Sequence, residues 1–323
     1  MKAFTLIAAK TLPEAAREAA RPQTALKAGG VDLVDRMKEG LDQPERVVSI
    51  AEIPGLDRIE AGPPARIGAL VRLAALAADS GVRKHYPALA AAAGEAATPQ
   101  IRNMATLGGN LCQRPRCWYY RLAEFPCRKK GGNDCFAQDG ENRFHAIFDT
   151  DQICICVHPS ATGAALLAYD ATVSTVSPQG SRTLAIRDFF TGPEPDPTRE
   201  NKLGPGEIVE SVSIPAPGAG ARSAYRKLKE KDSFDWPLVE ACVALRLEGG
   251  TIRDPRVVLG HVAQVPWRSK EAEAVLAGVR PSEDLLRRAA EASVAAARPL
   301  AQNAFKVRLA KVALQRALRD ALA

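Results

Sequence analysis

The pattern of apolar and polar residues in the first fifty positions predicts a small α/β unit. We expect a strand near Ala3–Ala8 and a helix over Pro13–Ala20. The stretch "QTALKAGGVDLVDRMKEG" predicts a strand, a glycine turn and a helix from about Asp32 to Glu39, and "RVVSI" predicts another short strand. This succession is typical of strands that alternate with helices.

A second unit is predicted to begin near Leu56. The stretch "RIGALVRLAALAADSG" predicts the end of a strand and then a helix that Gly81 closes. A further helix is expected in "YPALAAAAGEAA", and "HPSATGAALLAYDATVSTVSPQGSRTLAI" predicts helix, strand, turn and strand. Between them lies a long segment rich in cysteine and basic residues.

The last hundred residues are predicted to form a separate domain. Pro- and Gly-rich stretches at 191–207 and 215–221 indicate a domain edge. Strands are expected in "SAYRKLKEKDS", "VEACVALRLEGG" and "DPRVVLGHVA", followed by two helices. The final helix has Phe305, Leu309 and Val312 on one face and its basic residues mainly opposite, so we expect that face to cover a core.

Composition and charge exclude some classes of protein. A length of 323 residues suits two or three domains, and no stretch approaches twenty consecutive apolar residues, so we expect no membrane span. The net charge of +7 is spread along the chain without a recognition motif, which favours a solvated surface over nucleic-acid binding. The first twenty residues resemble a strand and a helix rather than a signal peptide. We therefore expect a cytoplasmic location, or a periplasmic one after co-export with a signal-bearing partner.

Two glycine turns are the candidates for binding an anion. Gly29 and Gly30 lie between a predicted strand and a predicted helix, and "ATLGGNL" repeats this arrangement with Thr106 and Asn110 beside its glycines. Glycines let backbone N–H groups approach an anion, and a helix N-terminus adds its dipole. One such turn is most often structural and neither matches GxGxxG, but two in one domain suit a diphosphate cofactor.

Six of the seven cysteines lie within residues 112–156. Four thiolates suit an iron–sulfur cluster or tetrahedral zinc, and six cysteines of an exported protein could form disulfides. The cysteines alone leave three equal alternatives. They hold an iron–sulfur cluster, they bind zinc or form disulfides, or they lie close together in the sequence by chance.

Several motifs together resemble the FAD-binding subunits of the xanthine dehydrogenase family. They occur in family order as "AGGVDLVDRMK", "IRNMATLGGNL", "HPS" with "YDA", "GPGEIV", "YRKLKEKDSFDWP" and "LGHVAQVPWR". The resemblance covers essentially the whole chain and is greatest to the medium subunit of bacterial periplasmic aldehyde oxidoreductases. It implies an α+β fold: a PCMH/vanillyl-alcohol-oxidase-type FAD-binding domain over 1–217, with α/β subdomains at about 1–55 and 56–217, and a CO-dehydrogenase-flavoprotein-like α+β domain over 218–323.

The resemblance also assigns FAD contacts. In the family the first turn wraps the pyrophosphate, the second contacts the diphosphate and ribityl chain, and the "YRKLK" strand lies near the flavin. The cofactor residues implied here are Lys27, Ala28, Gly29, Gly30, Val31, Asp32, Leu33, Thr106, Gly109, Asn110, Ser160 and Lys229. The chain departs from the family at Val31, where a hydroxyl residue is usual, and at Ala161, where Asp is usual.

The cysteine-rich insertion resembles one that holds a [4Fe–4S] cluster in these aldehyde oxidoreductases and in 4-hydroxybenzoyl-CoA reductase. The implied ligands are Cys117, Cys127, Cys135 and Cys154, with Cys112 and Cys156 spare and an exchange of Cys156 for Cys154 conceivable. Basic residues near these cysteines should raise the reduction potential of such a cluster. Alternatively, they form a solvated loop or a docking surface for another subunit. We expect His158 to belong to the "HPS" turn rather than to a metal site, Ser160 to cap a helix, and Cys242 to be a core residue.

The family resemblance implies an electron-transfer subunit with no catalytic residue of its own. The expected partners are a large molybdenum-cofactor (molybdopterin) subunit that oxidises aldehydes to acids and a small subunit with two [2Fe–2S] clusters, in a heterotrimer or a dimer of it. Electrons would pass through FAD to an external acceptor. Two alternatives are a 4-hydroxybenzoyl-CoA reductase-like subunit, in which electrons flow toward molybdenum, and a zinc-stabilised binding or scaffold protein.

Overall fold

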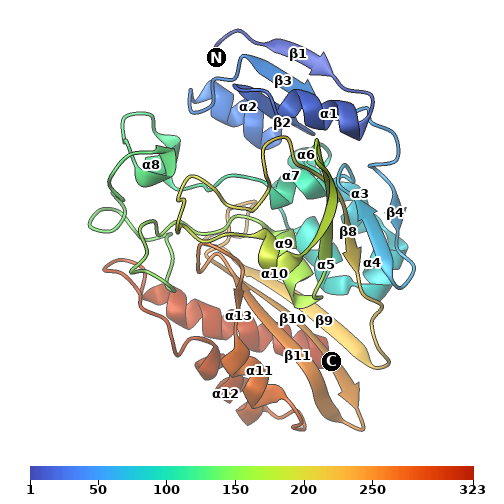
Figure 1. Cartoon of the computed structure of the whole chain (residues 1–323). Coiled ribbons are helices and arrows are strands. Elements are labelled where there is room, and N and C mark those ends of the chain that lie inside the picture. Colours follow the sequence, from blue (N-terminus) through green and yellow to red (C-terminus); the bar gives the residue numbers. More distant parts are fainter.

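Three separate β-sheets divide the chain into consecutive parts in the computed structural model, which describes residues 1–323. The N-terminal part lies at one end of the molecule and the C-terminal part at the other, with the middle part between them (Figure 1). The expected boundaries at 55/56 and 217/218 fall in the connections between β3 and β4 and between β8 and β9. None of the helices is long and apolar enough to cross a lipid bilayer.

The N-terminal part is the small α/β unit that the sequence predicts. Its elements are β1 (Thr5–Ala8), α1 (Leu12–Ala19), β2 (Thr24–Lys27), α2 (Val31–Lys38) and β3 (Arg46–Ser49). The three strands are parallel in the order β1-β3-β2. Helix α1 begins where Thr11 caps it by accepting the N–H of Glu14, with a proline in the first turn. The predicted strand–turn–helix order is confirmed.

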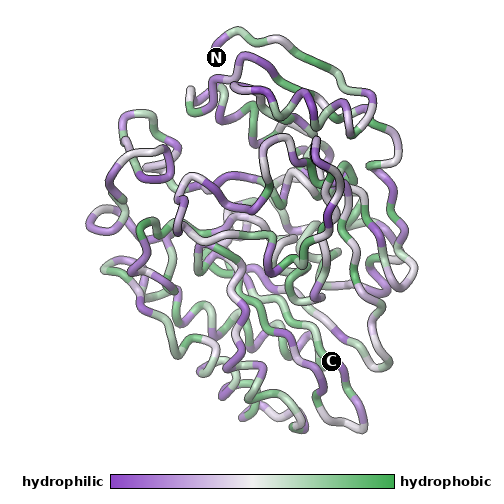
Figure 2. Tube along the Cα trace, in the orientation of Figure 1, coloured by the Kyte–Doolittle hydropathy of each residue, from purple (hydrophilic) through white to green (hydrophobic).

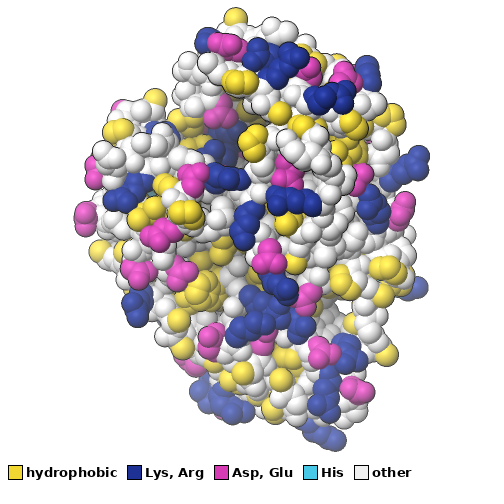
Figure 3. Space-filling view, viewed as in Figure 1, with side chains coloured by type: hydrophobic (Ala, Val, Ile, Leu, Met, Phe, Trp, Pro, Cys, Tyr) yellow, Lys and Arg dark blue, Asp and Glu magenta, His cyan; other side chains and the backbone are white.

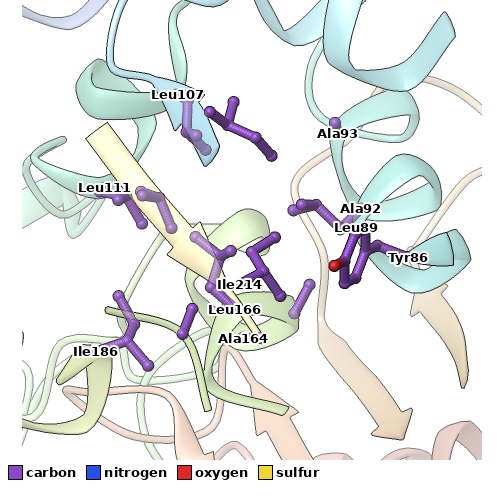
Figure 4. Close-up of a cluster of buried hydrophobic side chains, with 14 of the residues drawn as sticks. Tyr86, Leu89, Ala92, Ala93, Leu107, Leu111, Ala164, Leu166, Ile186 and Ile214 are labelled. Atoms are coloured by element: carbon purple, nitrogen blue, oxygen red, sulfur yellow. The ribbon is translucent and has the colours of Figure 1, made fainter. Parts of the chain in front are cut away.

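The middle part has an antiparallel sheet in the order β4-β5-β8-β6-β7. The strands are β4 (Ile59–Glu60), β5 (Ala65–Gly68), β6 (Thr172–Ser177), β7 (Gly180–Ala185) and β8 (Ile208–Ile214). The helices are α3 (Leu73–Ala78), α4 (Ser80–His85), α5 (Pro87–Gly94), α6 (Pro99–Arg102), α7 (Leu107–Leu111), α9 (Ala161–Ala168) and α10 (Ile186–Phe189). Side chains from α5, α7, α9 and β8 meet in its core, among them Leu89, Leu107, Leu166 and Ile214 (Figure 4).

One predicted helix end in this part is wrong. Gly81 does not close a helix but lies within α4, because Asp79 ends α3 and starts α4 by accepting the N–H of Val82. An N-cap carboxylate of this kind restarts a helix at once.

The C-terminal part packs helices on an antiparallel sheet, β12-β11-β10-β9. The strands are β9 (Ala221–Leu228), β10 (Val239–Glu248), β11 (Thr251–Gly260) and β12 (Trp267–Arg268), and the helices are α11 (Lys270–Leu276), α12 (Glu283–Ser293) and α13 (Phe305–Leu322). The three predicted strands are confirmed, but three helices replace the two expected. Helix α11 is only seven residues long, and the Ser269 side chain caps it.

The buried face of α13 also differs from the prediction. Phe305, Leu309 and Val312 are only partly buried, whereas small residues and two leucines face the sheet together with Lys306, which is 1% exposed. The Lys306 ammonium donates to the carbonyl oxygens of His145 (2.8 Å) and His261 (2.7 Å). Backbone acceptors therefore allow a lysine on the core face.

The cysteine-rich segment 112–156 has little regular structure. It contains α8 (Trp118–Arg121) and the 3₁₀ turn η1 (Arg128–Lys130), and the α8 region projects at the side of the molecule (Figure 1). Its trace is of mixed hydropathy (Figure 2). The segment is anchored to the C-terminal part, where Asn303 Nδ2 donates to the carbonyl oxygen of Ala146 (2.9 Å).

Candidate cofactor-binding site

Both predicted glycine turns line one cavity of about 610 Å³, to which all three parts of the chain contribute. This volume is ordinary for a cofactor site. Ten of the twelve predicted cofactor residues line the cavity, namely Lys27, Ala28, Gly29, Gly30, Val31, Asp32, Leu33, Thr106, Gly109 and Asn110. Ser160 and Lys229 are outside the lining set.

The first turn depends on two glycines for different reasons. A Cβ on Gly29 would lie 1.9 Å from the carbonyl oxygen of Met104, so only glycine lets this turn pack against the segment that leads into the second turn. Gly30 has a φ of +80° and is the N-cap of α2, where no side chain caps the helix. The free N–H groups and positive dipole end of α2 therefore face the cavity and suit an anion.

The second turn is held by hydroxyl groups. Thr106 Oγ1 accepts the N–H of Gly109 (3.1 Å) and caps α7. The Asn110 side-chain oxygen accepts from the hydroxyls of Ser160 (2.7 Å) and Thr162 (2.6 Å). Because both hydroxyls hold its oxygen, the Asn110 amide is oriented with its nitrogen left as a donor. Ser160, which also caps α9 as expected, thus acts on the cavity through Asn110.

A different lysine from the predicted one lines the cavity. Lys229 lies just beyond the end of β9, and its ammonium donates to the carbonyl oxygen of Ser233 (2.6 Å). Lys227, within β9, lines the cavity and donates to the carbonyl oxygen of Glu95 (2.9 Å). Side chains two residues apart share one face of a strand only while the strand continues, and here β9 has ended.

Asp32 does not present a free carboxylate to the cavity. It pairs with Arg36 on its own helix and with two residues of the cysteine-rich segment, Arg116 (2.5 Å) and Arg121 (2.9 Å). Burial alone would raise the pKa of Asp32, but Arg116 and Arg36 outweigh it and lower the pKa to about 2. The arginines thereby neutralise a negative charge that would otherwise repel a phosphate at this turn.

The four predicted cluster ligands, Cys117, Cys127, Cys135 and Cys154, line one small second cavity together with Cys156. All seven cysteines are free thiols, and the fully buried Cys242 is a core residue as expected. No group of three or more His, Cys, Asp or Glu side chains is arranged to hold a metal ion, so the geometry by itself does not show the predicted cluster.

Basic and aromatic side chains surround these cysteines. The buried ammonium of Lys129 pairs with Glu200 (2.7 Å), and burial raises the pKa of the Cys117 thiol to about 12. His145 Nε2 lies 3.2 Å from Cys117 Sγ, and burial, together with Lys306, lowers the pKa of His145 to about 4. The sequence offered no signal for His145, which stands alone in "RFHAIF".

His158 lies outside the cysteine cavity, as expected. Its Nδ1 accepts the N–H of Ser160 (3.3 Å), and its ring packs against Phe190 at 4.4 Å between centroids. The "HPS" turn is therefore a structural turn before α9.

At the molecular surface, Lys and Arg side chains are interspersed with Asp and Glu on the face shown in Figure 3.

Comparison with known proteins identifies the class. Residues 2–217 match the family model described as the FAD-binding domain in molybdopterin dehydrogenase, and residues 223–321 match that of the CO dehydrogenase flavoprotein C-terminal domain. The chain therefore belongs to the family of FAD-binding subunits of molybdopterin-dependent oxidoreductases.

Individual relatives agree with this class over nearly the full length. The chain is 38% identical to the aldehyde oxidoreductase FAD-binding subunit PaoB of Escherichia coli (strain K12), over 100% of this chain and 99% of the relative. It is 29% identical to the carbon monoxide dehydrogenase medium chain of Hydrogenophaga pseudoflava, over 92% and 89%. A solved structure of the carbon monoxide dehydrogenase from Hydrogenophaga pseudoflava aligns with a TM-score of 0.78 at 28% identity, covering 99% of this chain and 97% of that one. The expected fold is confirmed.

Proposed function

We propose that this chain is the FAD-carrying electron-transfer subunit of a heterotrimeric molybdenum-containing aldehyde oxidoreductase. The observation that carries the proposal is the single cavity that both glycine turns line. The similarity to an aldehyde oxidoreductase FAD-binding subunit over the whole chain supports the aldehyde substrate class. In this proposal a small subunit supplies electrons from [2Fe–2S] clusters, a large subunit carries molybdenum, and an external acceptor takes the electrons.

The residues of the cavity fit FAD chemically. The N-terminus of α2 and the Thr106–Asn110 turn offer N–H donors for a diphosphate, while Arg116 and Lys227 add positive charge. The apolar wall suits flat rings. When bound, FAD supplies the ability to accept electrons singly and to release two of them. The role of this chain is to bind the dinucleotide, orient it and exclude water from it.

We propose further that Cys117, Cys127, Cys135 and Cys154 hold a [4Fe–4S] cluster. Their position around one cavity supports this, and Cys156 on the same wall keeps its exchange with Cys154 open. The buried positive charge of Lys129 would favour the reduced cluster and raise its potential. The family membership does not support a zinc-stabilised scaffold.

Co-expression of the chain with a large and a small subunit of the family tests these proposals. We expect a purified heterotrimer with one FAD and additional iron in this chain, visible as a flavin absorption over a broad iron–sulfur background. Anaerobic assays with an aldehyde and with an aromatic acyl-CoA separate oxidation from the reductase alternative. A complex that lacks bound FAD would contradict the main proposal, and one with FAD but no iron in this chain would contradict only the cluster.

A further inference from the structure

A buried acid and a buried histidine lie together in the wall that the C-terminal part gives to the large cavity. Glu240 is on β10 and His261 directly follows β11, where Gly260 pairs with Glu240 across the sheet. The two side chains are 1% and 5% exposed, and His261 Nδ1 lies 3.3 Å from Glu240 Oε2. A Cβ on Gly260 would lie 2.4 Å from this oxygen, so glycine provides the space for the carboxylate.

Part of the hydrogen-bonding capacity of this pair is unused. Glu240 Oε1 accepts from the Tyr225 hydroxyl (2.5 Å). Glu240 Oε2 and His261 Nδ1 face each other at 3.3 Å without hydrogen-bond geometry, so these two atoms and His261 Nε2 are buried without a hydrogen-bond partner. Buried polar atoms without partners are rare and costly, and these three belong to side chains that line a cavity. The pair could therefore bind a ligand that has both a hydrogen-bond donor and a hydrogen-bond acceptor.

The neighbouring cavity wall, which is aromatic, favours a flat ligand. Phe234 and Trp236 line the same cavity yet are 60% and 50% exposed, and the Trp236 and His261 rings lie 6.4 Å apart between centroids. The Arg116 guanidinium lies over the Trp236 ring at 4.9 Å. Aromatic surface beside a donor–acceptor pair suits a flat heteroaromatic ring, whereas the glycine turns on the other two parts of the chain suit phosphates.

We propose that Glu240 and His261 bind the pyrimidine edge of the flavin ring, an inference that rests on the proposed function. That edge has an N–H between two carbonyl groups. Glu240 Oε2 accepts from the ring N–H, and His261 donates to an adjacent carbonyl. Both are positioning residues. They also shift the reduction potential of the flavin, His261 upward and Glu240 downward. Negative charge on a reduced ring is stabilised by the His261 donor and opposed by the Glu240 carboxylate.

The ionisation of Glu240 agrees with the acceptor role. Burial would raise the pKa of Glu240, but the nearby charge of His261 and the hydrogen bond from the Tyr225 hydroxyl outweigh it and lower the pKa. The carboxylate is thus an acceptor at neutral pH.

The test compares the full-length chain with Glu240→Gln, His261→Gln and a control, Glu273→Gln. Glu273 is a buried carboxylate of the same domain that bonds Arg268 and lies outside the cavity. Removal of flavin and titration with FAD should show Kd raised about tenfold or more by each cavity variant, since Glu240→Gln loses the carboxylate of a charge-assisted hydrogen bond and His261→Gln loses the imidazole that donates to the ring. The control should bind FAD as wild type does. The flavin potential, measured with mediator dyes, should rise in Glu240→Gln and fall in His261→Gln.

A ligand variant makes the test independent of variant folding. FAD methylated at the pyrimidine N–H should bind wild type at least about tenfold more weakly than FAD, because the donor to Glu240 is lost. Equal binding of the two flavins, or potentials that move in the same direction in both variants, would overturn the inference. Wild type that binds no FAD would instead overturn the proposed function.

Discussion

Asp32 and Arg116 form a 2.5 Å ion pair that joins the two candidate cofactor sites. Asp32 lies in the first turn of the helix that follows the first glycine turn, and Arg116 directly precedes Cys117. Asp32 also accepts the backbone N–H of Arg114 (3.0 Å). The start of the cysteine-rich segment is therefore fixed to the helix whose N-terminus faces the large cavity.

Replacement of Asp32 by Asn should destabilise the chain substantially. The change leaves Arg36, Arg116 and Arg121 partly buried without their shared counter-charge, and breaking such a network costs about 3 kcal/mol. Urea unfolding measures the free energy of unfolding. Asp284→Asn is the control, because its ion pairs are exposed and solvent screening leaves them with little effect on stability. Similar losses in the two variants would contradict this prediction.

The same carboxylate should make stability depend on acid pH. Its pKa is about 2 in the folded chain and 3.8 in the unfolded reference, so the unfolded state takes up a proton first as the pH falls. The stabilisation is complete above about pH 4 and is lost between about pH 4 and pH 2. The difference in unfolding free energy between wild type and Asp32→Asn should shrink over that interval. A difference independent of pH there would show that the folded and unfolded pKa values are alike.

Gly29→Ala should disrupt the first turn and weaken FAD binding by at least about tenfold. The new Cβ would lie 1.9 Å from a backbone carbonyl oxygen of Met104, which cannot move as a flexible side chain could. Gly62→Ala is the matched control, because nothing lies within 4 Å of its added Cβ and its φ is not positive. Fluorescence titration with FAD measures both. Unchanged affinity in Gly29→Ala would mean that the turn tolerates displacement.

Serine substitutions should define the ligands of the cluster. Cys117→Ser, Cys127→Ser and Cys135→Ser should each lose iron and acid-labile sulfide, because a hydroxyl is a poor ligand for iron–sulfur clusters. Of Cys154 and Cys156, only one should be essential, and the pair of variants decides which. Cys112, which lines the large cavity instead, is the control that should retain iron. Full iron in Cys117→Ser would contradict the assignment.

Lys306→Met should lower the free energy of unfolding by about 2 kcal/mol or more, because the buried carbonyl groups of His145 and His261 lose their donor. Thermal or urea unfolding measures the loss. Lys270→Met is the control, since this lysine side chain is 67% exposed. A stabilised Lys306→Met variant would show that burial of the ammonium costs more than its hydrogen bonds return.

Most strands and helices could be predicted from the sequence, and so could the two turns and the cysteine segment. Apolar periodicity and the glycines of "KAGGVD" and "TLGGN" act on neighbours a few residues away, so local sequence determines these features. The sequence signals for short helices were weaker. Helix α11 is too short for a clear period, and the restart of α4 depends on one cap at Asp79.

The partners of the functional side chains were decided by the tertiary structure. Asp32 meets Arg116 from 84 positions away, Lys306 reaches the carbonyl groups of two other segments, and Glu240 meets His261 only because β10 and β11 pair. Ion pairs and buried hydrogen bonds join residues that are distant in sequence, and their energy depends on burial and geometry. The sequence by itself thus determined where glycines and sulfur lie along the chain, while packing decided which charges face them.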